Sequence, residues 1–200
     1  MKLVSSTPIR NMATVGGNLV NASPIGDLTI FFLALDARIT LSGISGKREV
    51  ALKDFYKAYK SLDMQANEIV EKISFAIPDD HTLFNFEKVS KRTNLDIASV
   101  NSAIKITVID NTITEAVISA GGVGPVPLLL KKASAFLIDK VLNENNVLYA
   151  CFLAEEEISP ISDTRGSEMY KKLLLRQLIK AHFITLFDTI IAQNLIVAND

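Results

Sequence analysis

Residues 7–27, TPIRNMATVGGNLVNASPIGD, hold the densest group of small, flexible and polar residues in the chain. Within them Gly16 and Gly17 stand between apolar neighbours, and two asparagines follow at positions 18 and 21. Glycine loses more backbone entropy on folding than any other residue, so a glycine pair among hydrophobic residues indicates a special backbone conformation. One explanation is a concave nest of backbone N–H donors that faces an anion. The other is a tight turn between two buried segments.

Composition limits the kinds of partner that the chain can have. Its 200 residues, 48% of them hydrophobic, are enough for one sizeable domain or two small ones. A net charge of −1, from 21 basic and 22 acidic residues, gives no electrostatic basis for binding nucleic acid or an anionic membrane. No uncharged apolar run reaches the ~18 residues that span a bilayer, and no apolar signal core follows the N-terminus. We therefore expect a globular cytoplasmic protein with no nucleic acid or membrane partner.

The residues that most often bind metals are few. The single cysteine, Cys151, excludes an internal disulfide and a cysteine-ligated metal or iron–sulfur site within one chain. Its apolar neighbours predict an ordinary buried thiol. His81 and His182 are isolated and lack the spacing of a zinc site or a catalytic triad, which predicts structural roles for both. The glycines at 121–124 lack the strand and helix context of a dinucleotide motif, so we expect a loop there.

Hydrophobic periodicity predicts the elements of the first half. Residues 28–35 are apolar nearly all round, which indicates a short buried helix with Asp27 near its N-terminal end. Residues 38–42 and 48–52 alternate as the two strands of a hairpin. Residues 68–77 alternate too and end at Pro78, which predicts a strand with at least one well-buried face. The polar, turn-forming residues 78–82 predict a boundary between domains at 1–80 and 81–200.

The second half changes from strand patterns to helix patterns. Residues 83–90, 96–109 and 112–119 predict a three-stranded antiparallel sheet, with a turn at Asp110-Asn111. Residues 132–138, 144–157 and 166–194 show helical periodicity. Strands followed by helices indicate the α+β fold class, with a helical bundle over one face of the sheet.

Three stretches together resemble one protein family. The string IRNMATVGGN at 9–18, followed by NASPIGD at 21–27, resembles the second flavin-binding stretch of the FAD subunits of molybdenum hydroxylases. This is the xanthine dehydrogenase and carbon monoxide dehydrogenase family. Residues 86–98 and 158–176 resemble the first strands and the entry to the last helix of the C-terminal domain of those subunits. The resemblance implies a partial FAD-binding (PCMH/VAO-type) subdomain over 1–80 and a CO dehydrogenase flavoprotein C-terminal-like domain over 81–200.

The resemblance also assigns contacts with FAD to particular residues. The loop around the FAD phosphates and ribose would be formed by Thr14, Val15, Gly16, Gly17 and Asn18. Asp27 would make a polar contact with the cofactor, Val70 would touch its adenine end, and Lys88 would reach the flavin or phosphate region from the second domain. Taken alone, Asp27 also suits a helix N-cap, Val70 a core position and Lys88 a solvated charge. We expect no catalytic side chain and no metal ligand.

The implied function is that of an FAD-binding component of a xanthine dehydrogenase-type molybdenum hydroxylase. In this family a molybdenum cofactor on another subunit oxidises the substrate, and iron–sulfur clusters pass the electrons to FAD, which delivers them to NAD or another acceptor. The expected partners are the molybdenum-binding and iron–sulfur subunits, together with the N-terminal half of the flavin domain. The alternative is a truncated, non-catalytic remnant or docking module that does not retain FAD alone. Apolar remains of the cleft would also favour a homo-oligomer.

Overall fold

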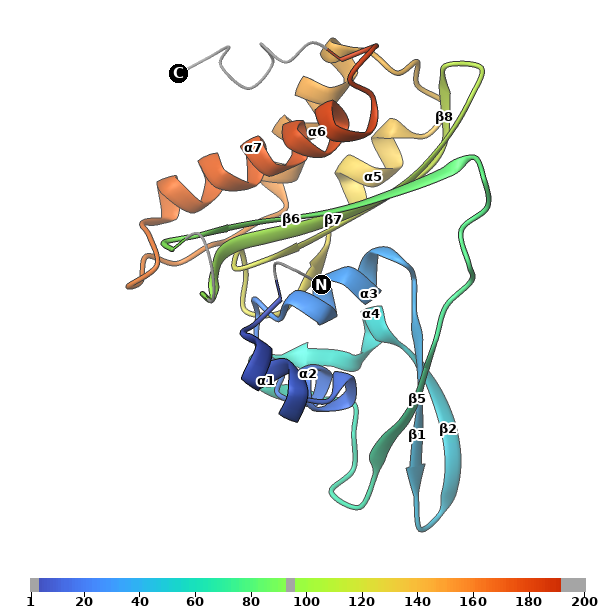
Figure 1. The fold of residues 1–200 in the computed structure, drawn as a ribbon, viewed down its shortest axis with the longest axis vertical. Helices are drawn as coiled ribbons and strands as arrows, with labels where there is room; N and C mark the ends of the chain where they lie inside the picture. Colours follow the sequence, from blue (N-terminus) through green and yellow to red (C-terminus); the bar gives the residue numbers. More distant parts are fainter. Residues whose placement is uncertain (1–3, 93–95, 192–200) are drawn as a thin grey trace.

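The computed structural model describes residues 4–92 and 96–191 of the 200-residue chain, and its helices and strands fall into two successive parts (Figure 1). The N-terminal part, residues 4–80, contains α1 (Thr7–Met12), α2 (Val15–Val20), α3 (Asp27–Ala34), β1 (Arg38–Gly43), β2 (Gly46–Ala51), α4 (Leu52–Phe55), β3 (Tyr56–Ala58), β4 (Ser61–Leu62) and β5 (Ile69–Ser74). The C-terminal part, residues 81–191, contains β6 (Thr82–Ser90), β7 (Ala98–Ile109), β8 (Thr112–Gly121), β9 (Leu128–Leu129), α5 (Lys131–Leu137), α6 (Glu144–Glu156) and α7 (Glu168–Leu186).

A three-stranded antiparallel sheet of order β2-β1-β5 organises the N-terminal part. The predicted hairpin is confirmed, with Ile39 opposite Val50. Its core also takes residues from α2, α3 and α4, among them Leu19, Ile30 and Phe55. The predicted well-buried face of β5 is wrong, because Ile69 is 65% exposed and Val70 is only partly buried. As an edge strand, β5 has β1 on one side only, and just part of it packs under α2.

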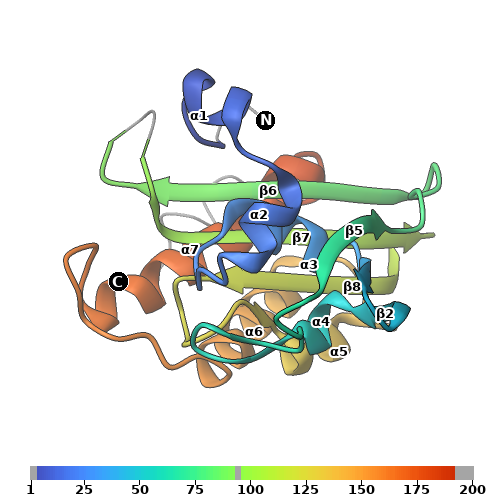
Figure 2. The same cartoon turned by 90° about the horizontal axis from the view of Figure 1, so that it is seen from below.

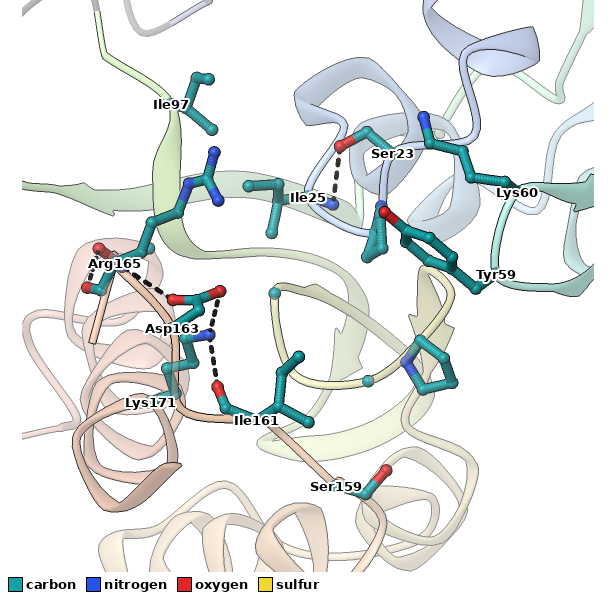
Figure 3. A pocket seen from close by; sticks show the side chains of 15 residues that line it. Ser23, Ile25, Tyr59, Lys60, Ile97, Ser159, Ile161, Asp163, Arg165 and Lys171 are labelled. Atoms are coloured by element: carbon teal, nitrogen blue, oxygen red, sulfur yellow. Dashed lines mark hydrogen bonds and ion pairs between the residues drawn. The ribbon is translucent and has the colours of Figure 1, made fainter. Parts of the chain in front are cut away.

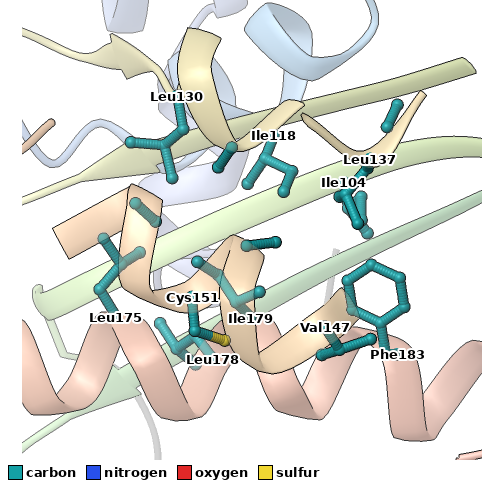
Figure 4. Packing of buried hydrophobic residues seen from close by; sticks show 14 of the residues in the cluster. Ile104, Ile118, Leu130, Leu137, Val147, Cys151, Leu175, Leu178, Ile179 and Phe183 are labelled. Atoms are coloured by element: carbon teal, nitrogen blue, oxygen red, sulfur yellow. The ribbon is translucent and has the colours of Figure 1, made fainter. Parts of the chain in front are cut away.

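A second antiparallel sheet, of order β6-β7-β8-β9, organises the C-terminal part. Its three long strands confirm the predicted sheet, and the two-residue β9 adds a fourth that was not predicted. Asp110 and Asn111 both have positive φ, 49° and 60°, which is the type I′ geometry expected of a two-residue hairpin turn. Helices α5, α6 and α7 cover one face of this sheet (Figure 1), as predicted. Figure 4 shows their apolar side chains packed against Ile104 and Ile118 of the strands.

The opposite face of the second sheet is covered by the N-terminal part. Helix α3 packs on β7 and β8 (Figure 2), and Ala103 of β7 belongs to the hydrophobic core of the N-terminal part. Strand β7 is therefore buried on both faces, including its polar residues Ser99, Asn101 and Ser102. This contact brings the start of α3, and with it Asp27, against the second sheet.

Candidate functional site

The glycine pair lies in a short helix. Thr14 is the N-cap of α2, and its Oγ1 accepts a hydrogen bond from the Gly17 backbone N at 2.9 Å. A Cβ at position 17 would lie 2.8 Å from that oxygen, so glycine here leaves room for the cap. The predicted loop is therefore wrong, as is the tight turn, because Thr14 caps a helical turn that includes both glycines.

Crowding does not explain the glycine at position 16. A Cβ there would meet nothing closer than the Cβ of Val70, at 3.5 Å, which is ordinary van der Waals contact. The structure thus brings two of the residues expected to bind FAD, from α2 and β5, next to each other. In the same helix the buried Oδ1 of Asn18, which a Cβ at Gly26 would approach to 3.3 Å, has no hydrogen-bond partner among the described residues. An unoccupied acceptor of this kind is uncommon in folded proteins and needs an explanation.

Asp27 and Lys88 form an ion pair that joins the two parts of the chain. Lys88 Nζ on β6 donates to Asp27 Oδ2 at 2.7 Å, and the two side chains are 5% and 12% exposed. Lys88 is therefore not a solvated charge. Asp27 is the first residue of α3 and Gly26 is its N-cap, so Asp27 is not the N-cap. Asn101 Nδ2 on β7 donates to the other carboxylate oxygen at 2.7 Å.

A pocket of about 900 Å³ opens between the two parts (Figure 3). Its volume lies within the usual range for small-molecule sites. It is lined by Ser23, Pro24, Ile25, Tyr59 and Lys60 of the N-terminal part and by Ile97, Ser99, Gly122, Gly124, Pro125, Ser159, Ile161, Asp163, Arg165 and Lys171 of the C-terminal part. None of the eight residues expected to bind FAD lines the pocket. It adjoins their site through the loop at 23–25, which leads directly into Asp27.

Polar groups are concentrated on one wall of the pocket. Lys171 is 3% exposed, and its Nζ lies 2.8 Å from both Asp163 Oδ2 and the Ile161 carbonyl oxygen. Burial alone would raise the pKa of Asp163, but hydrogen bonds from Lys171 and from the Arg165 backbone lower it below the usual value. These bonds fix the loop that carries Arg165, whose guanidinium extends along the wall on the side of Ile97 (Figure 3). The pocket is thus mainly apolar, with the positively charged side chains of Arg165 and Lys60 on opposite sides (Figure 3).

Three residues of this region were not predicted from the sequence. Asn101 lies within an apolar strand, where a polar residue normally faces solvent, so nothing marked it as buried. Tyr59 lies in a short turn with no motif. Arg165 stands in a stretch that resembles the family, but that resemblance assigned it no role.

The remaining reactive side chains lie outside this region. Cys151 is buried as predicted, and burial raises the pKa of its thiol to about 12. Burial lowers the pKa of His182 to about 3. Within residues 4–92 and 96–191, no three His, Cys, Asp or Glu side chains are grouped so as to hold a metal ion. None of the helices in this described part of the chain has the length and apolarity needed to cross a bilayer.

Comparison with known proteins places both parts in families. Residues 1–79 match the family described as FAD binding domain in molybdopterin dehydrogenase. Residues 86–186 match the family described as CO dehydrogenase flavoprotein C-terminal domain. The two matches follow each other in the order that the sequence predicts.

Individual relatives agree with these matches. The glyceraldehyde dehydrogenase medium chain of Sulfolobus acidocaldarius is 31% identical over 182 residues, which cover 91% of this chain and 64% of that protein. The nicotinate dehydrogenase FAD-subunit of Eubacterium barkeri is 29% identical over 189 residues and is also covered over 64% of its length. The structure of carbon monoxide dehydrogenase from Hydrogenophaga pseudoflava superposes with a TM-score of 0.87 at 27% identity, over 90% of this chain and 62% of the other.

The chain thus spans slightly less than two thirds of the length of these relatives. Within that span, the family matches and the superposition confirm the predicted α+β architecture of a flavin-binding part followed by an antiparallel sheet with helices. This chain therefore belongs to the family of the FAD-binding medium subunits of molybdenum hydroxylases.

Proposed function

We propose that this chain is the FAD-carrying component of a molybdenum hydroxylase, in which FAD receives electrons from iron–sulfur clusters and delivers them to NAD or another acceptor. One observation carries the proposal. Asp27 and Lys88, both assigned to FAD contacts by the family resemblance, are 61 residues apart in sequence, yet Lys88 Nζ and Asp27 Oδ2 lie 2.7 Å apart across the two parts of the chain. Opposite charges of this kind suit a ligand that offers both hydroxyl donors and phosphate acceptors.

The residues present fit one side of such a dinucleotide. A Cβ at Gly16 would make only ordinary contact with Val70, so packing does not require glycine there, and a ligand that approaches this backbone is another reason for it. The Asp27 carboxylate has about four lone-pair sites, of which Lys88 and Asn101 occupy two, so ribose hydroxyls can donate to the others. Nearby, the buried Oδ1 of Asn18 is an acceptor that lacks a donor within the described residues. These groups bind and orient; none is placed to act as an acid or a base.

FAD, when bound, would supply the redox chemistry itself, and the protein would supply its position and electrostatic surroundings. The other wall of the cleft would come from a segment like the remaining third of the medium-chain relatives. Molybdenum-binding and iron–sulfur subunits would be the electron-donating partners. The proposed electron path is that of xanthine dehydrogenase, which is one member of this family.

The pocket between the two parts is our candidate entry site for the electron acceptor. It adjoins the Asp27 loop and is mainly apolar, which suits a flat heteroaromatic ring such as nicotinamide. Arg165 at its edge offers a planar guanidinium to a phosphate or carboxylate group on the same molecule. Tyr59, on the opposite wall, offers an aromatic face and a hydroxyl (Figure 3).

Titration of the chain with FAD, followed by flavin fluorescence and visible absorbance, tests the proposal. We expect saturable binding, weakened by Asp27→Ala about tenfold to a hundredfold, because one charge-assisted hydrogen bond contributes about 1.5–3 kcal/mol. Unfolding curves of both proteins would show that the variant is folded at the titration temperature. A folded wild-type chain that leaves the flavin signals unchanged would contradict the proposal.

Two neighbouring glycine variants should have opposite effects on the ligand-free chain. Gly16→Ala should raise the free energy of unfolding by about 0.4–1 kcal/mol, because the methyl group fits and the unfolded chain loses freedom. Gly17→Ala should lower it, because the new Cβ would lie 2.8 Å from the capping oxygen of Thr14. Urea unfolding of both variants measures these changes.

The same Gly16→Ala variant should nevertheless bind FAD about tenfold less tightly, since its methyl group would hinder the approach of FAD to the backbone at position 16. Stronger folding together with weaker binding separates a ligand site from a packing site. Unchanged FAD affinity in Gly16→Ala would remove Gly16 from the proposed contact.

A non-catalytic docking module is the second candidate. Helix α1 has no buried residue, and Ile9, Met12, Ile69 and Ile77 expose large apolar side chains on the N-terminal part. Such a surface suits a covering segment or a second copy of the chain. The FAD titration discriminates between the two, because a docking module would leave the flavin signals unchanged.

A further inference from the structure

The second sheet determines the position of the segment that carries Asp27. Five hydrogen bonds, one of them also an ion pair, run from its strands and from Gly122, directly after β8, to residues 24–30. Gly122 N donates to the Pro24 carbonyl at 3.0 Å, and Ser119 Oγ donates to the Ile30 carbonyl at 2.7 Å. Lys88 and Asn101 both reach the Asp27 carboxylate. The local backbone of the N-terminal part is thus held by residues of the C-terminal part.

Two glycines allow this close approach. A Cβ at Gly121 would lie 2.9 Å from the Pro24 carbonyl oxygen and 2.2 Å from Asn101 Oδ1. A Cβ at Gly122 would lie 2.4 Å from the Ser99 carbonyl oxygen and 2.7 Å from a methyl group of Ile25. Gly122 also has a φ of +82°, which residues with a Cβ rarely adopt. Any side chain at these positions would push residues 24–27 away from β7, where Asn101 lies.

Asn101 meets only acceptors on the side that faces this segment. Its Nδ2 donates to Asp27 Oδ1 at 2.7 Å and to the Ile25 carbonyl at 3.2 Å. Since both partners are acceptors, the amide can present only its nitrogen to them, and its orientation is fixed. Asn101 is 0% exposed, so water does not reach its Oδ1, and this oxygen has no donor among the described residues. A buried oxygen without a donor is unfavourable, so the hydrogen bonds of the Asn101 nitrogen are the reason for an asparagine at this position.

We propose that Asn101 is a positioning residue for the cofactor, acting through Asp27. It fixes the rotation of the Asp27 carboxylate, with Lys88 on the second oxygen, so that the remaining lone pairs face the ligand. The proposal rests on the proposed function, since it assumes that Asp27 contacts FAD. It adds that FAD binding at the N-terminal part requires the C-terminal part to be docked, because Asn101 lies on β7.

A double-mutant cycle tests this on the full chain, with FAD affinity and the free energy of unfolding as separate readouts. The variants are Asn101→Val, Asp27→Ala and the combination of both. Valine suits a strand and has no donor. Asn101→Ser, too short to reach Asp27, replaces it if the valine variant does not fold. Ser102→Ala is the matched control, because Ser102 is equally buried and donates within the sheet, to the Ser119 carbonyl.

We expect Asn101→Val to weaken FAD binding about tenfold in the wild-type chain and to have no effect when Asp27 is already alanine. Ser102→Ala should leave FAD affinity unchanged. Equal losses with and without Asp27 would show a general distortion of the sheet and overturn the proposal, as would an Asn101→Val chain that binds FAD normally. If the wild-type chain itself binds no FAD, the proposed function is wrong. Non-additive effects of the two substitutions on the free energy of unfolding would then show only that Asn101 and Asp27 stabilise the fold together.

Discussion

Lys88→Met should lower the free energy of unfolding by about 3–5 kcal/mol, which is the usual loss when one partner of a buried ion pair is removed. The side chains of Lys88 and Asp27 are only 5% and 12% exposed, so water compensates poorly for the loss of the ammonium group. Methionine keeps most of the length and volume of lysine, so the change isolates the charge. Urea unfolding at neutral pH measures the loss.

The Lys105–Glu115 pair provides the matched control, because it lies on the same sheet and is also 2.6–2.7 Å long, yet its glutamate is 46% exposed. Lys105→Met should cost less than about 1 kcal/mol. Adding Asp27→Asn to Lys88→Met should recover part of the loss, since the stranded charge is then gone. Equal losses for Lys88→Met and Lys105→Met would contradict the view that the Asp27–Lys88 pair is desolvated.

Residues 38–52 and 83–119 show which parts of the fold the sequence predicts well. Their alternating patterns and turn residues are local signals, and the structure has the hairpin and the three long strands where they indicate. The last helix was expected over 166–194 and is found as Glu168–Leu186; residues 192–194 lie outside the described part. Strand β9 was missed because two residues are too short to carry a period.

The glycine segment shows where the sequence alone does not predict the local structure. The resemblance implied a loop at 14–18, but the Thr14 cap and packing against α3 and β5 hold Val15–Val20 helical, although glycine disfavours helix. The burial of β5 was also overestimated, because alternation shows that one face is apolar without showing that anything covers it. Both errors concern contacts between elements, which a pattern along the chain does not contain.

The candidate site is likewise only half visible in the sequence. The resemblance named Asp27 and Lys88, and the structure brings them together. It did not name Asn101, which completes the same cluster, because strand β7 is buried on both faces and its polar residues point inward. The two faces pack against helices from different parts of the chain, so the burial of Asn101 depends on how those parts dock. The domain boundary near residue 80 and the FAD contacts themselves stay predictions.

His182 offers a second large effect, which depends on pH. It lies on α7 with no exposed surface, and Asn85 Nδ2 donates to its Nδ1 at 3.1 Å. The neutral ring therefore carries its proton on Nε2, which has no acceptor within the described residues. The nearest carboxylate on the facing strand, Glu87, accepts from the same Asn85 nitrogen and not from the ring. Burial lowers the pKa of His182 from 6.5 to about 3.

The folded chain should therefore lose stability as the pH falls below 6.5, because the unfolded chain then binds a proton at His182 that the folded chain does not. The slope approaches about 1.4 kcal/mol per pH unit, which gives a loss of about 2 kcal/mol between pH 7 and pH 5. His182→Asn, which can still accept from Asn85, should remove this slope, whereas His81→Asn in an exposed turn should not. Carboxylates such as Glu68, whose pKa its hydrogen bond with Arg48 lowers to about 2, lose their contribution only below about pH 4.5, outside this window. Urea unfolding at pH 7, 6 and 5 measures the three slopes, and equal slopes for His182→Asn and wild type would show that another group titrates.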